Sequence, residues 1–435
     1  MPLPRPRLAA LLLLSLVPLA LGEVRDAFFV LSGAIALLAA LLALLDWRAA
    51  SPAGLSVRRL ADPQLSIGAP NRVRLAVRNP SGSEVQAMLR DEVPFSFRVD
   101  RLVIPHVVAP GAETVVEYVA RPRHRGTFAF GRVHLRVRGP LDLVERQRSV
   151  PLGAPAHVYP DLREVRRYEL TVRRGLAYAA GQRRARTPGS GSVFERLREY
   201  TPDDDPRSIS WTATARRGRP ISVEYETERQ QRVLMLLDAG RMMASTLGDL
   251  SKLDHAVNTA LMLGYVATAK GDEVGLLGFA DGVRSYAPPR RGRRQFLRLT
   301  EDLRRLEVTT TETDYRAAFE FLRGRTARRS LVVLFTDLVD QEASRGLVRA
   351  VTQLAGSNLV LCCLLGDPLL EETATRPPAT TTALYERVVA QEVREARARA
   401  LATLIRRGVH VVDVSAERLS VATIDRYLEL KRRFL

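Results

Sequence analysis

Two pairs of aspartates stand where carboxylates could do chemistry. Asp238 and Asp337 each close a run of apolar residues, and Asp204 and Asp205 are adjacent in an arginine-rich stretch. In an open α/β sheet, ligands bind at the carboxyl ends of the strands. Adjacent carboxylates can instead share the acid and base roles of a hydrolase. The first pair therefore suggests a ligand-binding position and the second a catalytic pair.

The catalytic interpretation of Asp204 and Asp205 competes with a structural one. Acid–base catalysis also requires a nucleophile or a metal and a pocket, and the spacing supplies none of these. A network of ion pairs with Arg198 and Arg207 explains the alternating charges more simply. We predict that this segment fixes or docks neighbouring structure through Arg198, Tyr200, Asp204, Asp205, Arg207 and Trp211.

Other catalytic patterns are absent from the sequence. It has no G-x-x-x-x-G-K-[ST] loop to cradle phosphates and no G-x-S-x-G elbow for a nucleophilic serine. The six histidines lie far apart, without metal-ligand spacing. Cys362 and Cys363 are adjacent in an apolar run, which favours a buried structural role over a strained mutual disulfide. We predict that the chain is not an enzyme.

Asp238 and Asp337 need a sheet to position them. Residues 232–435 alternate apolar runs with helical patterns, which is typical of a doubly wound α/β domain. Strands are predicted at 233–237, 273–279, 330–336, 358–365 and 409–414, and helices at 253–269, 314–323, 345–355, 384–407 and 420–434. Ligands of such sheets bind at the carboxyl ends of the strands, where both aspartates fall.

Residues 55–160 have the period-two pattern of half-buried antiparallel strands. Val73, Leu75 and Val77 alternate with Arg72 and Arg74, and clusters of Pro and Gly mark the turns. An immunoglobulin-like β-sandwich is predicted. Residues 161–231 then form a basic connector that includes the Asp204–Asp205 segment. This connector is either a solvated linker or a docking surface for an acidic partner.

Residues 1–50 contain two uncharged apolar runs, at about 8–22 and 27–45. The second is long enough to cross a hydrocarbon core of roughly 30 Å. We predict a transmembrane hairpin; a cleaved signal peptide is the alternative for the shorter first run. Arginines flank the hairpin on both outer sides, which places the soluble domains in the cytoplasm, at the inner (cytoplasmic) membrane.

The formal charge of +18 invites a nucleic-acid interpretation. The basic residues are spread along the soluble part, however, and not gathered on one element, so no nucleic-acid partner is expected. Only Lys252, Lys270 and Lys431 among the 66 basic residues are lysines. The excess of arginine is more easily ascribed to a GC-rich coding sequence than to phosphate recognition.

Three stretches together resemble the domain of unknown function 58 family. The first runs from Gly191 to Arg207 and on to Trp211, and is similar to the family pattern L-R-x-Y-x-P-G-D-D-x-R-x-I-D-W. It departs at Asp203, where the family has glycine, and at Ser210, where the family has aspartate. The second stretch comprises residues 236–243, continued by 252–256 and 271–275. The third comprises residues 313–316 and 334–338. The resemblance covers essentially the whole chain and implies a membrane anchor and a von Willebrand factor A-like domain.

The resemblance also implies a metal position. In A-type domains, an Asp-x-Ser-x-Ser turn, a threonine and a later aspartate supply oxygen ligands to Mg²⁺. Asp238, Thr313 and Asp337 match three of these roles, but Gly240 and Met242 stand at the serine positions. A thioether is a poor ligand for a hard ion. We therefore expect weak or no Mg²⁺ binding, with Asp238 and Asp337 lining a partner-facing cleft.

Members of this family are commonly associated with MoxR-type AAA+ ATPases. The resemblance therefore favours a non-enzymatic, membrane-tethered adaptor whose cytoplasmic domain mediates protein–protein interaction in complex assembly or maturation. The alternative is a membrane-linked hydrolase that uses Asp204, Asp205 or Asp238. An envelope nucleic-acid binder is a third possibility, and it predicts a steep salt dependence of duplex binding.

Overall fold

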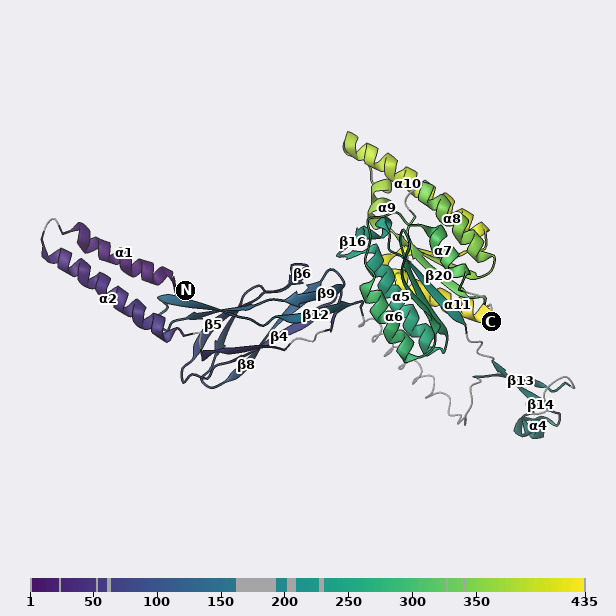
Figure 1. The fold of residues 1–435 in the computed structure, drawn as a ribbon, viewed down its shortest axis with the longest axis horizontal. Coiled ribbons are helices and arrows are strands. Elements are labelled where there is room, and N and C mark those ends of the chain that lie inside the picture. The colour runs from purple at the N-terminus through teal and green to yellow at the C-terminus, as the bar shows by residue number, and fades with distance from the viewer. Residues whose placement is uncertain are drawn as a thin grey trace. The chain divides into compact units, whose positions relative to one another are not determined.

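The computed structural model describes residues 2–22, 25–51, 54–60, 64–161, 193–201, 209–226, 231–325, 328–338 and 341–433. The chain divides into two compact units, residues 1–162 and 163–435 (Figure 1). The predicted residues Asp204, Asp205 and Arg207 lie outside the described residues.

Two apolar helices begin the first unit. They are α1 (Pro6–Ala20) and α2 (Ala27–Ala49), and they lie side by side in Figure 1. The Ser32 hydroxyl of α2 donates a hydrogen bond of 2.7 Å to the Ser15 carbonyl of α1. Within the described part of the chain, α2 is the helix long and apolar enough to cross a membrane, and α1 is shorter.

The rest of the first unit is a β-domain. Its sheets have the orders β1-β11-β10-β5-β7, β2-β4-β8-β6 and β3-β12-β9. The strands are β1 (Pro2–Pro4), β2 (Ser56–Leu60), β3 (Gln64–Ser66), β4 (Asn71–Arg78), β5 (Val85–Asp91), β6 (Phe97–Val99), β7 (Ile104–Val108), β8 (Glu113–Pro122), β9 (Gly126–Phe130), β10 (Val133–Arg138), β11 (Val144–Val150) and β12 (Ala154–Tyr159).

The core of the β-domain follows from the alternation in its strands. Val73, Leu75 and Val77 of β4 are fully buried, while the arginines between them are exposed. One buried polar cluster joins two sheets across this core. Asp91 of β5 accepts hydrogen bonds from Tyr118 of β8 (2.7 Å) and from Arg59 of β2 (2.5 Å). Burial and the Asp91 charge raise the pKa of Tyr118, so its hydroxyl stays a donor to that carboxylate.

A small hairpin with one helix opens the described part of the second unit. β13 (Val193–Glu199) pairs with β14 (Ile221–Glu226), and α4 (Trp211–Arg217) lies between them in the chain. The Ser210 hydroxyl caps α4 by accepting a hydrogen bond from the Ala213 amide. β13, α4 and β14 are thus regular elements within residues 161–231, which were predicted to be a connector.

The α/β domain, residues 232–433, holds a six-stranded sheet of order β19-β18-β15-β20-β21-β22. All neighbouring pairs are parallel except the edge pair β18–β19. The strands are β15 (Arg232–Asp238), β18 (Glu273–Phe279), β19 (Val283–Arg290), β20 (Leu331–Thr336), β21 (Leu359–Gly366) and β22 (His410–Ser415). A short pair, β16 (Thr246–Leu247) and β17 (Leu250–Ser251), follows the 3-10 turn η3 (Arg241–Ala244).

Helices cover both faces of this sheet (Figure 1). They are α5 (Lys252–Ala269), α6 (Arg293–Arg305), α7 (Tyr315–Arg323), α8 (Gln341–Ala355), α9 (Pro368–Thr375), α10 (Thr381–Arg406) and α11 (Ala416–Arg433). Leu234 shares a buried cluster with residues of α7, α8 and α10. The next residue along β15, Met235, points to the opposite face, where it approaches Gly264 of α5. Side chains that alternate along a strand therefore contact different helix layers.

Cys362 and Cys363 of β21 are fully buried free thiols. Burial raises the pKa of Cys363 to about 12, and burial together with the charge of Cys363 raises the pKa of Cys362 further. Because the thiolate is the reactive form, both side chains are protected from alkylation while the α/β domain is folded. They are the only two cysteines of the chain, so their labelling reports on this domain alone.

Candidate functional site

Asp238 lies at the carboxyl end of β15, and every acceptor position of its carboxylate is filled. Its Oδ1 accepts hydrogen bonds from the Gly240 amide (2.9 Å) and the Thr313 hydroxyl (2.6 Å). Its Oδ2 accepts from the Tyr315 hydroxyl (2.8 Å) and the Thr336 hydroxyl (2.7 Å). A carboxylate offers about four lone-pair sites. The fully buried Asp238 is therefore satisfied by the protein alone.

Tyr315 is held beside Asp238 in its neutral form. Burial and the charge of Asp238 raise the pKa of Tyr315 well above its usual value. Its hydroxyl therefore remains a hydrogen-bond donor at physiological pH. Tyr315 is the first residue of α7, and the Asp314 side chain caps that helix by accepting from the Ala317 amide. The cap thus fixes where α7 begins and where the tyrosine enters the site.

Gly240 gives Thr313 access to Asp238. A Cβ at position 240 would lie 2.1 Å from the Thr313 hydroxyl oxygen and 3.2 Å from Asp238 Oδ1. Any side chain at this position, including the serine of the A-type pattern, would have to displace Thr313. The direct contact between Thr313 and Asp238 therefore requires that position 240 is glycine and not serine.

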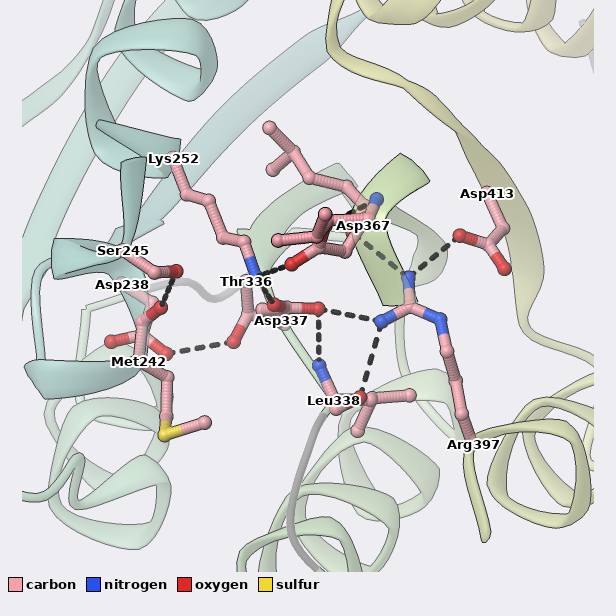
Figure 2. A network of polar contacts seen from close by, with 12 residues as sticks. Asp238, Met242, Ser245, Lys252, Thr336, Asp337, Leu338, Asp367, Arg397 and Asp413 are labelled. Carbon is pink, nitrogen blue, oxygen red and sulfur yellow. Dashed lines mark hydrogen bonds and ion pairs between the residues drawn. The ribbon is translucent and has the colours of Figure 1, made fainter. Parts of the chain in front are cut away.

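Asp337 follows β20 and is bonded to two buried cations. Its Oδ2 lies 2.5 Å from Lys252 Nζ, and its Oδ1 lies 2.6 Å from Arg397 Nη1 (Figure 2). The Leu338 amide also donates to Oδ1, at 2.7 Å. The side chains of Lys252 and Asp337 are 3% and 0% exposed, so this ion pair is shielded from water and salt. Ser251 caps α5, so that Lys252 is its first residue.

Two further carboxylates complete this charged cluster. Arg397 of α10 donates to Asp413 of β22 at 2.7 Å and to the Leu365 carbonyl at 3.1 Å. Asp367, the N-cap of α9, lies 3.8 Å from Lys252 Nζ. Burial opposes the charge of Arg397, but Asp413 and Asp337 outweigh it and raise the pKa of the guanidinium. The cluster combines carboxylates from within β22 and from the residues after β20 and β21 with cations from α5 and α10.

The structure brings the three predicted metal residues to one end of the sheet. Thr313 touches Asp238 directly, and Asp337 follows Thr336, which also donates to Asp238. Their oxygens do not suit a divalent ion, because protein hydrogens and two cationic side chains already occupy them. No group of three or more His, Cys, Asp or Glu side chains with metal-binding geometry occurs in the described ranges.

The burial of the site changes its expected role. Asp238 and Asp337 were predicted to line a cleft, but their exposed fractions are 0% and 4%. A partner could not touch them without a rearrangement of the strand ends. The solvent-facing carboxylates are instead those of Asp367 and Asp413, whose side chains are 32% and 30% exposed.

The predicted signature residues lie on the small hairpin where they are described. Arg198 belongs to β13, and Tyr200 follows it with its amide bonded to the Pro220 carbonyl at 3.0 Å. Trp211 begins α4, and its side chain is 71% exposed. The structure thus places these three residues on one supersecondary unit, apart in sequence from the Asp238 cluster.

Lys252, Arg397, Asp367 and Asp413 were not predicted as site residues. One signal could have identified the lysine. In a chain with only three lysines, Lys252 and Lys431 both form buried pairs with aspartates, the second with Asp272 at 2.7 Å. An ammonium is a compact point charge that arginine does not replace geometrically. Two of the three lysines thus form such pairs with buried aspartates, whereas Lys270 is exposed.

Known proteins share limited similarity with the chain. Uncharacterized protein Rv1480 from Mycobacterium tuberculosis (strain ATCC 25618 / H37Rv) is 24% identical over 207 residues, which is 47% of this chain and 64% of that protein. Uncharacterized protein Mb1516 from Mycobacterium bovis matches to the same extent. The match spans somewhat less than two thirds of the length of these relatives.

Two solved structures show weaker likeness. An aerotolerance-related membrane protein from Bacteroides fragilis NCTC 9343 is 16% identical, with a TM-score of 0.32, and the match covers 46% of this chain and 99% of that chain. The CARDB domain of a Pyrococcus furiosus protein is 16% identical, with a TM-score of 0.18, and covers 24% and 91%. Both TM-scores are too low to establish a shared overall fold.

A known protein family matches the region that contains most of the β13–β14 hairpin and most of the α/β domain. Residues 196–379 match the family described as "Protein of unknown function DUF58". This range includes Asp238, Lys252, Thr313 and Asp337. The apolar helix α2 and the several sheets fit a membrane-anchored multidomain protein. The chain is therefore similar to this family over residues 196–379, which is less than half of its length.

Proposed function

We propose that the chain is a non-enzymatic, membrane-tethered adaptor. Its α/β domain, of the von Willebrand factor A-like type, would dock a MoxR-type AAA+ ATPase on the cytoplasmic side of the membrane during complex assembly or maturation. The observation that carries this proposal is the saturation of Asp238 and Asp337, whose oxygens are all bonded to protein donors. A general base or a nucleophile needs a free lone pair within reach of substrate.

An exposed apolar surface on α10 supports a docking role. We call it the α10 patch: Leu384, Tyr385, Val388 and Val389, with exposed fractions between 45% and 69%. The four residues of α10 are spaced i, i+1, i+4 and i+5, so they share one face of the helix. Arg397 belongs to α10 as well, so this helix carries both the patch and part of the charged cluster. Contiguous exposed apolar side chains mark interaction sites.

Binding to the ATPase tests the proposal. Full-length protein in lipid nanodiscs is titrated with a purified MoxR-type ATPase in the presence of ATP. The double variant Tyr385→Ala/Val389→Ser is expected to weaken binding about tenfold or more, because large exposed aromatics dominate interface energies. Val421→Ser on α11 is the matched control, since Val421 is 63% exposed and lies off the patch. Equal affinity of all three proteins would refute the patch, and no binding by wild type would refute the partner.

The contacts at the start of the chain support a hairpin with both ends on one side of the membrane. β1, before α1, pairs with β11 of the β-domain, and α2 ends beside the turn that precedes β11. Arg5 forms ion pairs with Asp142 (2.9 Å) and with Glu145. A cleaved first segment would remove β1 and Arg5 from this sheet. The arginines on both sides of the hairpin favour a cytoplasmic location.

A topology reporter checks this arrangement. Alkaline phosphatase fused after Leu435 is active only outside the cytoplasm, so we expect the fusion to be silent. A green fluorescent protein fused at the same position should instead fluoresce. Strong phosphatase activity would refute both the orientation and the cytoplasmic ATPase.

The alternative function is a hydrolase that uses Asp204, Asp205 or Asp238. It predicts turnover of a broad hydrolase substrate by the full-length protein, with loss of turnover in Asp238→Asn or Asp204→Asn. The adaptor predicts no turnover above background in any of these proteins. An activity that depends on one of these aspartates would overturn the adaptor.

A further inference from the structure

We infer that the ammonium of Lys252 is a built-in cation, which takes the part that a divalent metal ion plays in metal-binding A-type domains. The α/β domain then holds its strand ends together without metal. The inference stands on the charged cluster itself and does not depend on the identity of the partner.

The position of the ammonium is the first argument. Lys252 Nζ lies 2.5 Å from Asp337 Oδ2 and 3.8 Å from Asp367 Oδ2, so it links carboxylates that follow β20 and β21 (Figure 2). Bridging carboxylates from different strand ends is what a metal ion does in an open α/β sheet. A lysine ammonium is a compact charge with three donors, which makes it suitable for this role.

The balance of charge is the second argument. The cluster contains the cations Lys252 and Arg397 and the carboxylates of Asp337, Asp367 and Asp413. Asp337, the only fully buried one of the three, already faces both cations. A divalent ion bound to Asp337 would lie next to these two positive groups in a poorly screened interior, where like charges repel strongly. The resident cations therefore exclude a metal as well as replace it.

The state of Asp238 is the third argument. Its four hydrogen bonds from Gly240, Thr313, Tyr315 and Thr336 leave no free acceptor for a metal. In a metal site these oxygens would face the ion, and the hydroxyl of a serine at position 240 would join them. Both carboxylates of the expected metal pair therefore accept hydrogen bonds from the protein. Asp337 accepts them from the two cations, and Asp238 from three hydroxyls and an amide. The lysine and the tyrosine together account for the loss of the site.

The thiols of Cys362 and Cys363 provide the measurement. Both are fully buried in β21, next to β20 and β22. In the full chain in nanodiscs, the rate of maleimide labelling reports how often the α/β domain opens. A bound ligand with a Kd of about 1 mM, present at about 10 mM, lowers the open population roughly tenfold. Metal binding is therefore visible without any assay of function.

Wild-type protein is expected to label at the same rate in EDTA, Mg²⁺ and Mn²⁺. Lys252→Ala should label faster, because Asp337 and Asp367 lose their shared cation. In this variant, Mn²⁺ at about 10 mM should slow labelling about tenfold, since two carboxylates and water suffice for a weak site. Lys252→Gln, which keeps donors without the charge, replaces the alanine variant if that protein does not fold.

Lys431→Ala is the matched control, because it removes the other buried lysine–aspartate pair of the domain, Lys431–Asp272. It should also label faster, but with no response to Mn²⁺. Two results would overturn the inference. The first is slower labelling of wild type in Mg²⁺ or Mn²⁺, which would make metal a resident cofactor. The second is the same metal response in the Lys252 and Lys431 variants.

Discussion

Asp337→Ala is expected to destabilise the α/β domain by about 3–5 kcal/mol, because removal of one member of a buried ion pair leaves its partners uncompensated. Lys252 and Arg397 would both lose this carboxylate, and their side chains are only 3% and 10% exposed. For a domain of this size, the melting temperature should fall by roughly 6–20 °C. The temperature at which Cys362 and Cys363 become reactive in the full-length protein measures the change.

A matched control and a compensating variant sharpen this test. Asp281→Ala removes an exposed aspartate that pairs with Arg284 on the surface, and should change stability by about 0.5 kcal/mol or less. Adding Lys252→Met to Asp337→Leu should recover about 0.5–3 kcal/mol, because one of the two cations that paired with Asp337 is removed too. A melting temperature of Asp337→Ala equal to that of Asp281→Ala would contradict the buried network.

The α/β sheet could be predicted closely because its signals are local. Runs such as 233–237 and 330–336 are apolar throughout, as parallel strands covered on both faces must be. β15 differs from the prediction by one residue at each end, and β20 by one residue at its start. The same holds for α5, whose capping box marks its start at Lys252. Burial on both faces of a strand and the capping of a helix can both be recognised in a short stretch of sequence.

The edge strand and its neighbouring helix were not predicted, for two physical reasons. β19 contains Pro288 and Pro289, which cannot donate to a ladder and normally argue against a strand. An antiparallel edge strand with one free side tolerates them. α6 carries arginines at 293, 294, 298, 304 and 305, which hide the apolar stripe through Leu299 and Leu303. In both elements, the tertiary position overrides the local composition.

The candidate site could be predicted only as positions along the chain. Asp238 and Asp337 were identified because each follows a buried strand. The hydrogen-bond donors to these carboxylates come from residues that are distant in the sequence. Thr313 and Tyr315 lie about 75 residues beyond Asp238, and Arg397 lies 60 residues beyond Asp337. Pairings of this range depend on the closed fold. A cation in place of a metal is therefore a property that spacing alone cannot indicate.

The junction between α2 and the β-domain was also not predicted, and it centres on a single carboxylate. Asp46 is 1% exposed and lies in the last turn of α2. Its oxygens accept hydrogen bonds from the amides of Leu141 (2.7 Å), Leu143 (2.8 Å) and Val144 (2.9 Å). The turn before β11 thus forms a cradle of backbone donors around this charge.

Gly139 is part of this cradle. A Cβ at position 139 would lie 2.2 Å from Asp46 Oδ1, so only glycine leaves room for the carboxylate. Arg146 adds a second contact from β11, since its guanidinium lies 4.8 Å from the centre of the Trp47 ring and donates to the Trp47 carbonyl at 3.3 Å. The end of α2 is therefore held to the β-domain by hydrogen bonds to Asp46 and by the cation–π contact at Trp47.

Asp46→Ala is expected to release the turn at residues 139–144 in the membrane-embedded protein. Three buried amides would lose their acceptor, and each unsatisfied donor costs about 1–3 kcal/mol. Amide exchange of this turn, measured by mass spectrometry in nanodiscs, should accelerate about 100-fold or more, because each tenfold corresponds to about 1.4 kcal/mol. Gly139→Ala should accelerate it as well, by expelling the same carboxylate. Asp26→Ala, at the other end of α2, is the matched control, since the Asp26 side chain caps nothing. If Asp46→Ala and Asp26→Ala exchange alike, the carboxylate does not hold the β-domain to the helix.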